Sequence, residues 1–220
     1  MDGPEVSSDD YRRCLADLAA VNRVTLTHGP TLRWLDRVTA GWPSAAPLSI
    51  LDVGCGQGDL LRAIHRWAQR RGRTVTLTGL DLNPASATAA RDATPSGMAI
   101  AWRTGDVFAY APSPRPDLIV SSQFAHHLGD DQVVELLRWL DRYAARGWFI
   151  ADLQRHWFAY YGFRWLARLA GWHRIVRLDG TLSIARSFRR AEWRELLGRA
   201  GVEGEIRWHV PFRICVARAR

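Results

Sequence analysis

The sequence contains no lysine, so all 30 of its basic residues are arginine. With 22 acidic residues the formal net charge is +8, a value compatible with a nucleic-acid partner or an anionic membrane surface. The arginines are scattered rather than clustered, and the exclusive use of arginine is typical of genomic base composition rather than of selection for phosphate binding. Charge alone therefore does not predict that the chain binds nucleic acid.

Cysteine is scarce and long apolar runs are missing. Cys14, Cys55 and Cys215 are far apart and form no C-x-x-C pair, which argues against disulfides and a zinc site. No apolar run reaches the length of a membrane-spanning helix, and residues 1–10 are too acidic and polar for a secretory signal. We therefore expect a cytoplasmic protein of 220 residues with one sizeable domain, a cap and no bound metal.

The most informative segment is ILDVGCGQGD at residues 50–59. The apolar run that ends in Asp52 predicts a buried strand, and the glycines let the backbone turn tightly and approach a ligand before a helix begins. A dinucleotide fingerprint reads G-x-G-x-x-G. Here Gly58 comes one residue early and Asp59 follows it, so the spacing favours another ligand, and Asp52 indicates that this ligand has a cationic part.

This pattern resembles motif I of the class I S-adenosylmethionine-dependent methyltransferases. The resemblance implies an α/β, Rossmann-like fold with a mostly parallel seven-stranded sheet, an antiparallel last strand and a helical cap. It also implies that the glycine turn lies against the methionine part of S-adenosylmethionine. The cofactor contacts expected in this segment are Asp52, Gly54, Cys55, Gly56 and Gly58.

Two further acids follow predicted strands. Residues 74–80 are β-branched and apolar and lead to Asp81, where a carboxylate is placed to accept both hydroxyls of a ribose. In the methyltransferase family, Asp81 would bind the ribose and Leu82 would lie against adenine. After a short strand at residues 98–102, the resemblance assigns Asp106 to the adenine amino group, with Val107 donating through its backbone. A helix N-cap or an ordinary turn acid is the alternative interpretation of these two carboxylates.

The chain divides into an N-terminal helical cap at residues 1–47 and a methyltransferase domain at residues 48–220, with a cap insertion at residues 154–186. Strands and helices alternate from residue 48 to the fifth strand, which predicts a parallel sheet with helices on both faces. Ligands bind outside the carboxyl ends of such strands. Ser122 lies at one of these ends and is expected to contact the cofactor, and Arg23 is expected to approach the cofactor carboxylate from the N-terminal cap.

The end of the fourth predicted strand reads SSQFAHHL at residues 121–128. It lacks the Asn/Asp-Pro-Pro-aromatic sequence of family members that methylate base or glutamine amines, and it lacks the carboxylate cluster of metal-dependent catechol enzymes. The chain also lacks the catalytic lysine of enzymes that methylate ribose hydroxyls. These absences disfavour nucleobase, ribose and magnesium-dependent chemistry.

The histidines are the candidate catalytic residues. His126 and His127 resemble the pair found in small-molecule methyltransferases of the ubiquinone/menaquinone type, and a histidine with a near-neutral pKa is a suitable base for a phenol. His156 is a rival base. The alternative is that these histidines orient the loop or pack beneath the cofactor.

The insertion is rich in aromatic residues. Trp157, Tyr161 and Trp165 recur every four residues on one helical face, and Tyr160 adjoins them. An aromatic face over the cofactor would form a dry lid for a flat, lipophilic acceptor, so these four residues are the expected substrate contacts. Ordinary packing of a cap helix and an interfacial helix that dips into a membrane are the alternatives.

Residues 178–188, together with the Asn22-Arg23 pair, resemble methyltransferases encoded beside type III polyketide synthases, which O-methylate phenolic lipids such as alkylresorcinols and related quinones. We therefore expect methyl transfer from S-adenosylmethionine to a hydroxyl of a small lipophilic phenol, resorcinol or hydroxyquinone. C-methylation of a quinone ring carbon, an RNA-directed methyltransferase and a non-catalytic cofactor-binding module are the alternatives. The protein is expected to be a monomer or a homodimer, and to contact membranes at most peripherally.

Overall fold

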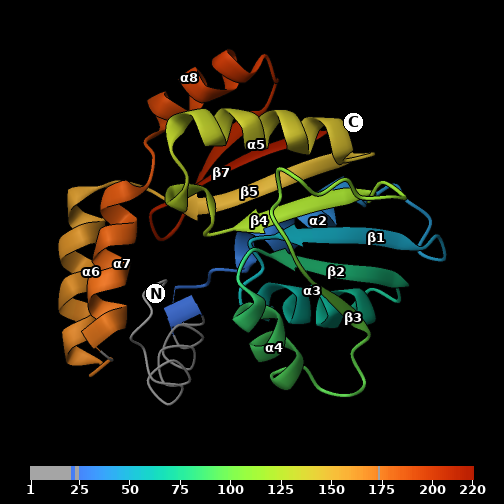
Figure 1. The fold of residues 1–220 in the computed structure, drawn as a ribbon, viewed down its shortest axis with the longest axis horizontal. Coiled ribbons are helices and arrows are strands. Elements are labelled where there is room, and N and C mark those ends of the chain that lie inside the picture. Colours follow the sequence, from blue (N-terminus) through green and yellow to red (C-terminus); the bar gives the residue numbers. More distant parts are fainter. Residues whose placement is uncertain (1–20, 23–24, 173) are drawn as a thin grey trace.

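A seven-stranded sheet forms the centre of the computed structural model, which describes residues 21–22, 25–172 and 174–220. The strands are β1 (Leu48–Val53), β2 (Val75–Asp81), β3 (Ile100–Thr104), β4 (Leu118–Ser122), β5 (Gly147–Leu153), β6 (Glu205–His209) and β7 (Arg213–Ala219). Their order across the sheet is β3-β2-β1-β4-β5-β7-β6 (Figure 1).

The strand directions confirm the predicted sheet. β1 pairs in parallel with both β2 and β4, β2 pairs in parallel with β3, and β4 pairs in parallel with β5. β7 runs antiparallel to both of its neighbours, β5 and β6. As a result the start of β7 meets the end of β5, and Arg213 lies opposite Leu153. The first side chain of the last strand is thereby brought to the edge where ligands bind in such sheets.

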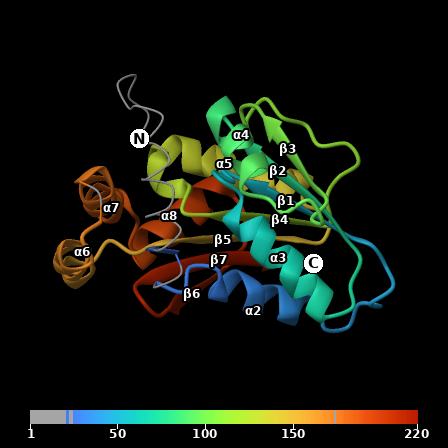
Figure 2. The same ribbon diagram turned by 90° about the horizontal axis from the view of Figure 1, so that it is seen from below.

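Helices cover both faces of the sheet (Figure 2). α2 (Gly29–Val38) and α3 (Asp59–Arg70) lie on one face, and α5 (Asp130–Tyr143) and α8 (Arg190–Ala200) lie on the other. α4 (Pro84–Asp92) contacts β2 and β3. Because both faces are buried, the central strands are apolar along their length, and polar groups come at the strand ends.

The core alternates along each strand, as the two-residue period of a strand requires. In β4, Leu118 and Val120 pack with the α2 and α3 side of the core, whereas Ile119 packs with the α5 and α8 side. In β1, Ile50 and Leu51 divide in the same way. The sheet is therefore fixed from both sides, and the residues at its carboxyl edge are held by rigid strands.

The predicted insertion forms two helices, α6 (Trp157–Leu169) and α7 (Arg174–Arg186). They pack against each other and lie beyond the carboxyl ends of the parallel strands (Figure 1). Residues 1–20 of the expected N-terminal helical cap lie outside the described residues, whereas α2 falls within that cap. Within the described part of the chain, no helix is both long and apolar enough to span a membrane.

Candidate active site

A cavity of about 710 Å³ lies at the carboxyl edge of the sheet. Its wall is formed by the ends of β1, β2, β4 and β5, the segment before α2, the start of β7, and residues of α6 and α7. This volume is in the range of pockets that hold small molecules and cofactors. The cavity thus brings the motif I turn and the insertion together in one site.

The glycines of motif I are required by the local geometry. Gly54 has a φ of +69°, and a Cβ there would lie 2.6 Å from the ring of Phe124. Gly58 has a φ of +75° and a Cβ there would overlap the ring of Trp102. Gly58 does not line the cavity and instead precedes the first residue of α3. Its role in this structure is therefore to let the chain turn into the helix.

Asp52 is a buried carboxyl group at the end of β1. Its side chain is 1% exposed, and its Oδ1 has no hydrogen-bond partner among the described residues. Burial, followed by the nearby carboxylates of Asp59 and Asp81, raises the pKa of Asp52 well above its ordinary value. A buried acid with an unsatisfied oxygen in a cavity wall fits a cationic group of a ligand.

Asp81 fixes the turn from the neighbouring strand. Its Oδ2 accepts a hydrogen bond from the Gly56 backbone N–H at 2.8 Å, and its Oδ1 accepts one from the Asn83 N–H at 3.0 Å. Each carboxylate oxygen keeps a further lone pair, which is what two ribose hydroxyls require. Leu82 follows with its side chain 72% exposed, and it lines the cavity as an adenine-contacting residue would.

The structure brings most of the expected cofactor contacts together. Those that line the cavity are Asp52, Gly54, Cys55, Gly56, Asp81, Leu82 and Ser122. The Ser122 Oγ is buried there without a partner among the described residues, so it is able to bond a ligand. Asp106 and Val107 do not line the cavity; Asp106 is exposed and accepts the Phe108 N–H at 3.0 Å. Arg23 lies outside the described residues.

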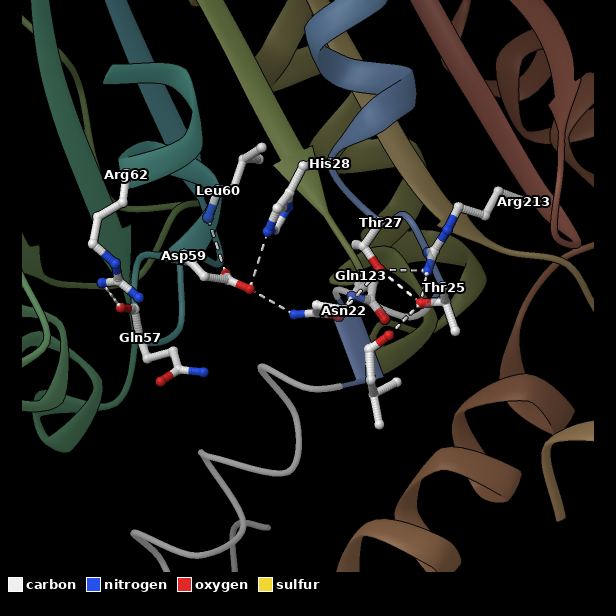
Figure 3. A network of polar contacts seen from close by, with 11 residues as sticks. Asn22, Thr25, Thr27, His28, Gln57, Asp59, Leu60, Arg62, Gln123 and Arg213 are labelled. Atoms are coloured by element: carbon white, nitrogen blue, oxygen red, sulfur yellow. Dashed lines mark hydrogen bonds and ion pairs between the residues drawn. The ribbon is translucent and has the colours of Figure 1, made fainter. Parts of the chain in front are cut away.

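A polar network joins the segment before α2 to the motif I turn (Figure 3). The Asn22 amide donates to Asp59 Oδ2 at 2.6 Å and accepts from Gln123 Nε2 at 2.7 Å. His28 Nε2 lies 3.3 Å from the same Asp59 oxygen. Burial lowers the pKa of His28 more than Asp59 raises it, which favours the neutral imidazole. The residues of this network form one side of the cavity, and motif I did not predict the roles of their side chains.

A buried histidine–aspartate pair lies between β4 and β5. His126 belongs to a short 3₁₀ turn, Ala125–His127, and its Nδ1 lies 2.7 Å from Asp152 Oδ1, at the end of β5. The His126 backbone N–H also donates to Asp152 Oδ2 at 3.0 Å. Burial alone would lower the pKa of His126, but the Asp152 carboxylate and its hydrogen bond raise it overall. The same pairing outweighs burial at Asp152 and lowers its pKa.

The other two histidines are placed differently. His127 is exposed, lines the cavity, and has its ring centroid 4.2 Å from that of His126. His156 does not line the cavity, because it forms the N-cap of α6. Its Nδ1 accepts the Phe158 N–H at 3.2 Å, and its ring stacks on Phe212 at 5.0 Å. In this structure His156 therefore caps α6 and lies outside the cavity lining.

The expected aromatic substrate contacts require a correction. Trp157, Tyr161 and Trp165 are 70%, 55% and 63% exposed, and neither they nor Tyr160 line the cavity. The helix is rotated relative to the expectation, so its other face meets the cavity. The α6 residues that line the cavity are Phe158, Ala159, Gly162, Phe163 and Leu166. The four expected residues thus lie outside the cavity, whereas other residues of the same helix line it. Sequence alone did not distinguish the two faces, because aromatic side chains occur on both.

Comparison with known proteins finds methyltransferases, the class of enzyme that motif I indicates. Residues 50–147 match a family model described as a methyltransferase domain. Over 103 residues the chain is 32% identical to trans-aconitate 2-methyltransferase from Mycolicibacterium gilvum (strain PYR-GCK), a stretch that covers 46% of this chain and 36% of that protein. The chain thus spans just over a third of the length of this relative.

Solved structures share the fold. The plantazolicin methyltransferase BpumL in complex with S-adenosylhomocysteine superposes with a TM-score of 0.68 at 15% identity, covering 97% of this chain and 91% of that chain. The magnesium protoporphyrin IX methyltransferase ChlM from Synechocystis PCC 6803, with bound S-adenosylhomocysteine, gives 0.60 at 17% identity, covering 100% and 90%. At these identities the likeness is one of fold. The matched methyltransferase domain at residues 50–147, motif I and the shared fold together support a class I S-adenosylmethionine-dependent methyltransferase.

Proposed function

We propose that this protein transfers a methyl group from S-adenosylmethionine to a hydroxyl of a small lipophilic phenol, resorcinol or hydroxyquinone. The observation that carries the proposal is the set of residues that line the cavity at the carboxyl edge of the sheet. The glycine turn and its acids line this cavity together with apolar residues of α6 and α7, and His126 of the buried His126–Asp152 pair lines it as well. Such an arrangement suits a cationic cofactor beside an acceptor that must lose a proton.

The residues of the glycine turn fit the cofactor. The buried, unsatisfied Asp52 oxygen suits a cationic group, Asp81 suits the ribose, and Leu82 offers an apolar surface for adenine. Ser122 supplies a further hydroxyl in the cavity wall. S-adenosylmethionine supplies an electrophilic methyl group on a sulfonium. The contribution of the protein is to hold the acceptor in line with that group and to take up the proton of the acceptor.

We assign the base to His126 rather than to His127 or His156. When Nδ1 donates to Asp152, the Nε2 of the neutral ring carries the lone pair that accepts a proton. The buried carboxylate then stabilises the imidazolium that forms, in agreement with the raised pKa of His126. Since the acceptor loses its proton to His126, activity should rise as the pH passes upward through that pKa.

The part of the cavity that we assign to the methyl acceptor is lined by apolar residues from three parts of the chain. Phe163 and Leu166 come from α6, Val176 and Ile184 from α7, and Phe212 precedes β7. A dry wall of this kind favours a lipophilic ring and excludes water from the transfer. The family match ends at residue 147, before any of these residues, so the acceptor is inferred from the cavity of this chain itself.

The proposal is tested in two steps. Calorimetric titration of S-adenosylhomocysteine into the wild type and Asp81→Ala, with NAD as a control, should give micromolar binding that the substitution removes. A panel of alkylphenols, resorcinols and hydroxyquinones is then incubated with methyl-labelled cofactor, and the site of the label is read by mass spectrometry. Label on oxygen supports the proposal, whereas label on ring carbon replaces it with C-methylation.

The same experiments address the other candidate functions. Cofactor binding with no turnover across the panel would indicate a non-catalytic module or a different acceptor. Tight, salt-sensitive RNA binding would favour an RNA-directed enzyme. RNA binding no stronger than that of a neutral control protein removes that alternative.

A further inference from the structure

Arg213 is a buried cation in the cavity wall that the proposed function does not use. It is the first residue of β7, its side chain is 1% exposed, and it lines the cavity. Its Nη2 donates to the hydroxyls of Thr25 and Thr27 at 3.0 and 2.6 Å (Figure 3). Its Nε and Nη1 are buried and have no hydrogen-bond partner among the residues that the structure describes.

The charge of Arg213 is not matched by a paired acid. Both hydrogen-bond partners are neutral hydroxyls, and no described carboxylate forms an ion pair with the guanidinium. Asp152 is the acid that most raises the pKa of Arg213, but burial has the larger effect and lowers that pKa overall. Asp152 already binds His126, so its charge is shared. A buried cation with unsatisfied donors is costly, and a protein that keeps one generally has an anion for it.

The cavity is therefore polarised. Three of the four acids that line it, Asp52, Asp59 and Asp81, lie around the ends of β1 and β2, and the fourth, Asp179, lies on α7. Arg213 begins a strand separated from β1 by β4 and β5. At ordinary strand spacing the two strands are roughly 14 Å apart. The acidic end matches the cationic cofactor, so the anion that suits Arg213 belongs at the other end, beside His126.

We propose that Arg213 binds a carboxylate inside this cavity, and that this carboxylate belongs to the methyl acceptor. The inference rests on the proposed function and narrows it, because the preferred acceptor is then an alkyl hydroxybenzoate rather than a neutral phenol. A single guanidinium suits one singly charged group such as a carboxylate. Threonine hydroxyls hold the guanidinium in place without cancelling its charge.

The first arm of the test compares two acceptors by calorimetry in the presence of S-adenosylhomocysteine. The probes are an alkyl dihydroxybenzoate and the alkylresorcinol that differs from it only by the carboxylate. The wild type should bind the acid roughly 10- to 100-fold more tightly, as expected for charge-assisted hydrogen bonds. Arg213→Gln should abolish this preference and Arg213→Lys should retain part of it. Equal affinity of the wild type for both probes overturns the proposal, even if Arg213→Gln does not fold.

Matched variants separate binding from folding. Thr27→Val removes one partner of Nη2 but keeps the charge, so it should keep the preference for the acid. Arg207→Gln changes an exposed arginine of β6 outside the cavity and should behave as the wild type. Loss of the preference in either variant contradicts a role that depends on the Arg213 charge.

The second arm distinguishes the other source of a carboxylate, which is the amino-acid part of the cofactor. S-adenosylhomocysteine and 5′-methylthioadenosine, which lacks that part, are titrated into the wild type and Arg213→Gln. Unchanged affinity for both nucleosides supports assignment to the acceptor. A loss confined to S-adenosylhomocysteine assigns Arg213 to the cofactor and overturns our proposal. Both arms measure binding, so they remain informative if no phenol is methylated and the proposed function fails.

Discussion

Replacing Asp152 with asparagine should change stability and activity in ways that depend on pH. Asp152 and His126 are 1% and 5% exposed and share two hydrogen bonds, so the pair is fully desolvated. Breaking a buried pair costs about 3 kcal/mol or more. The amide keeps the shape of the carboxyl group and one acceptor, so we expect about 3 kcal/mol of lost stability where both groups are charged.

The pH window follows from the directions of the two pKa shifts. Because the folded-state pKa of His126 is raised, its contribution is complete below its ordinary value of 6.5 and is lost as the pH rises through the raised value. Because the pKa of Asp152 is lowered, its contribution is complete above 3.8 and is lost as the pH falls through the lowered value. The pair therefore stabilises the fold most between these two limits.

Chemical denaturation of the wild type and Asp152→Asn at about pH 5.5 and about pH 9 measures this effect. The difference in unfolding free energy should be largest at the lower pH. Asp131→Asn is the matched control, because Asp131 is 95% exposed and its ion pair with Arg199 should contribute under about 1 kcal/mol. A difference for Asp152→Asn that is small, or equal at both pH values, refutes the reasoning.

The same variant tests the catalytic assignment. Without the carboxylate, burial lowers the pKa of His126, and Nδ1 loses the partner that fixes the tautomer. The wild-type profile of kcat/KM should rise through an inflection above 6.5, and the variant should inflect below it with a plateau roughly 100-fold lower or more. An unchanged profile would exclude His126 as the base.

Three further substitutions test the site. Gly58→Ala should lower the unfolding free energy by about 1–2 kcal/mol or more and weaken cofactor binding, because its φ is positive and Trp102 occupies the space; Gly97→Ala, which meets nothing within 4 Å, should be neutral in the same denaturation assay. Phe163→Ala should raise the KM for a lipophilic acceptor roughly tenfold, whereas Trp165→Ala should leave that KM unchanged. A larger effect of Trp165→Ala than of Phe163→Ala would instead favour the face of α6 that carries Trp157, Tyr161 and Trp165. Asn22→Ala should weaken S-adenosylhomocysteine binding roughly tenfold in calorimetry, because the amide joins Asp59 to Gln123, and an unaltered affinity would show that the network does not shape the cofactor side.

Local sequence patterns predicted the strands and their ends well. Apolar runs mark β1 and β4, and β-branched and apolar residues mark β2, so the positions of Asp52, Asp81 and Ser122 at the carboxyl edge could be predicted from each strand and its own end. The tight turn at the glycines between residues 54 and 58 could be predicted, because their positive φ values depend on the chain within a few residues.

Features that depend on distant parts of the chain could not be predicted from the local sequence. The rotation of α6 depends on which face meets α7 and the cavity, and aromatic residues on both faces removed the usual polar–apolar contrast. We propose His126 rather than His127 as the base because His126 pairs with Asp152, which is 26 residues away on another strand. Arg213 is one of 30 arginines, and only the antiparallel course of β7 places it in the cavity.

The hydrogen bond between Arg213 and Thr27 joins residues 186 positions apart. During synthesis, the segment before α2 and the glycine turn emerge early, but the wall that faces them is absent until the last strand has left the ribosome and paired with β5. The cavity wall is therefore complete only once β7 has paired with β5. Shortening the chain by its last strand should leave a protein that has every residue of motif I and no closed site.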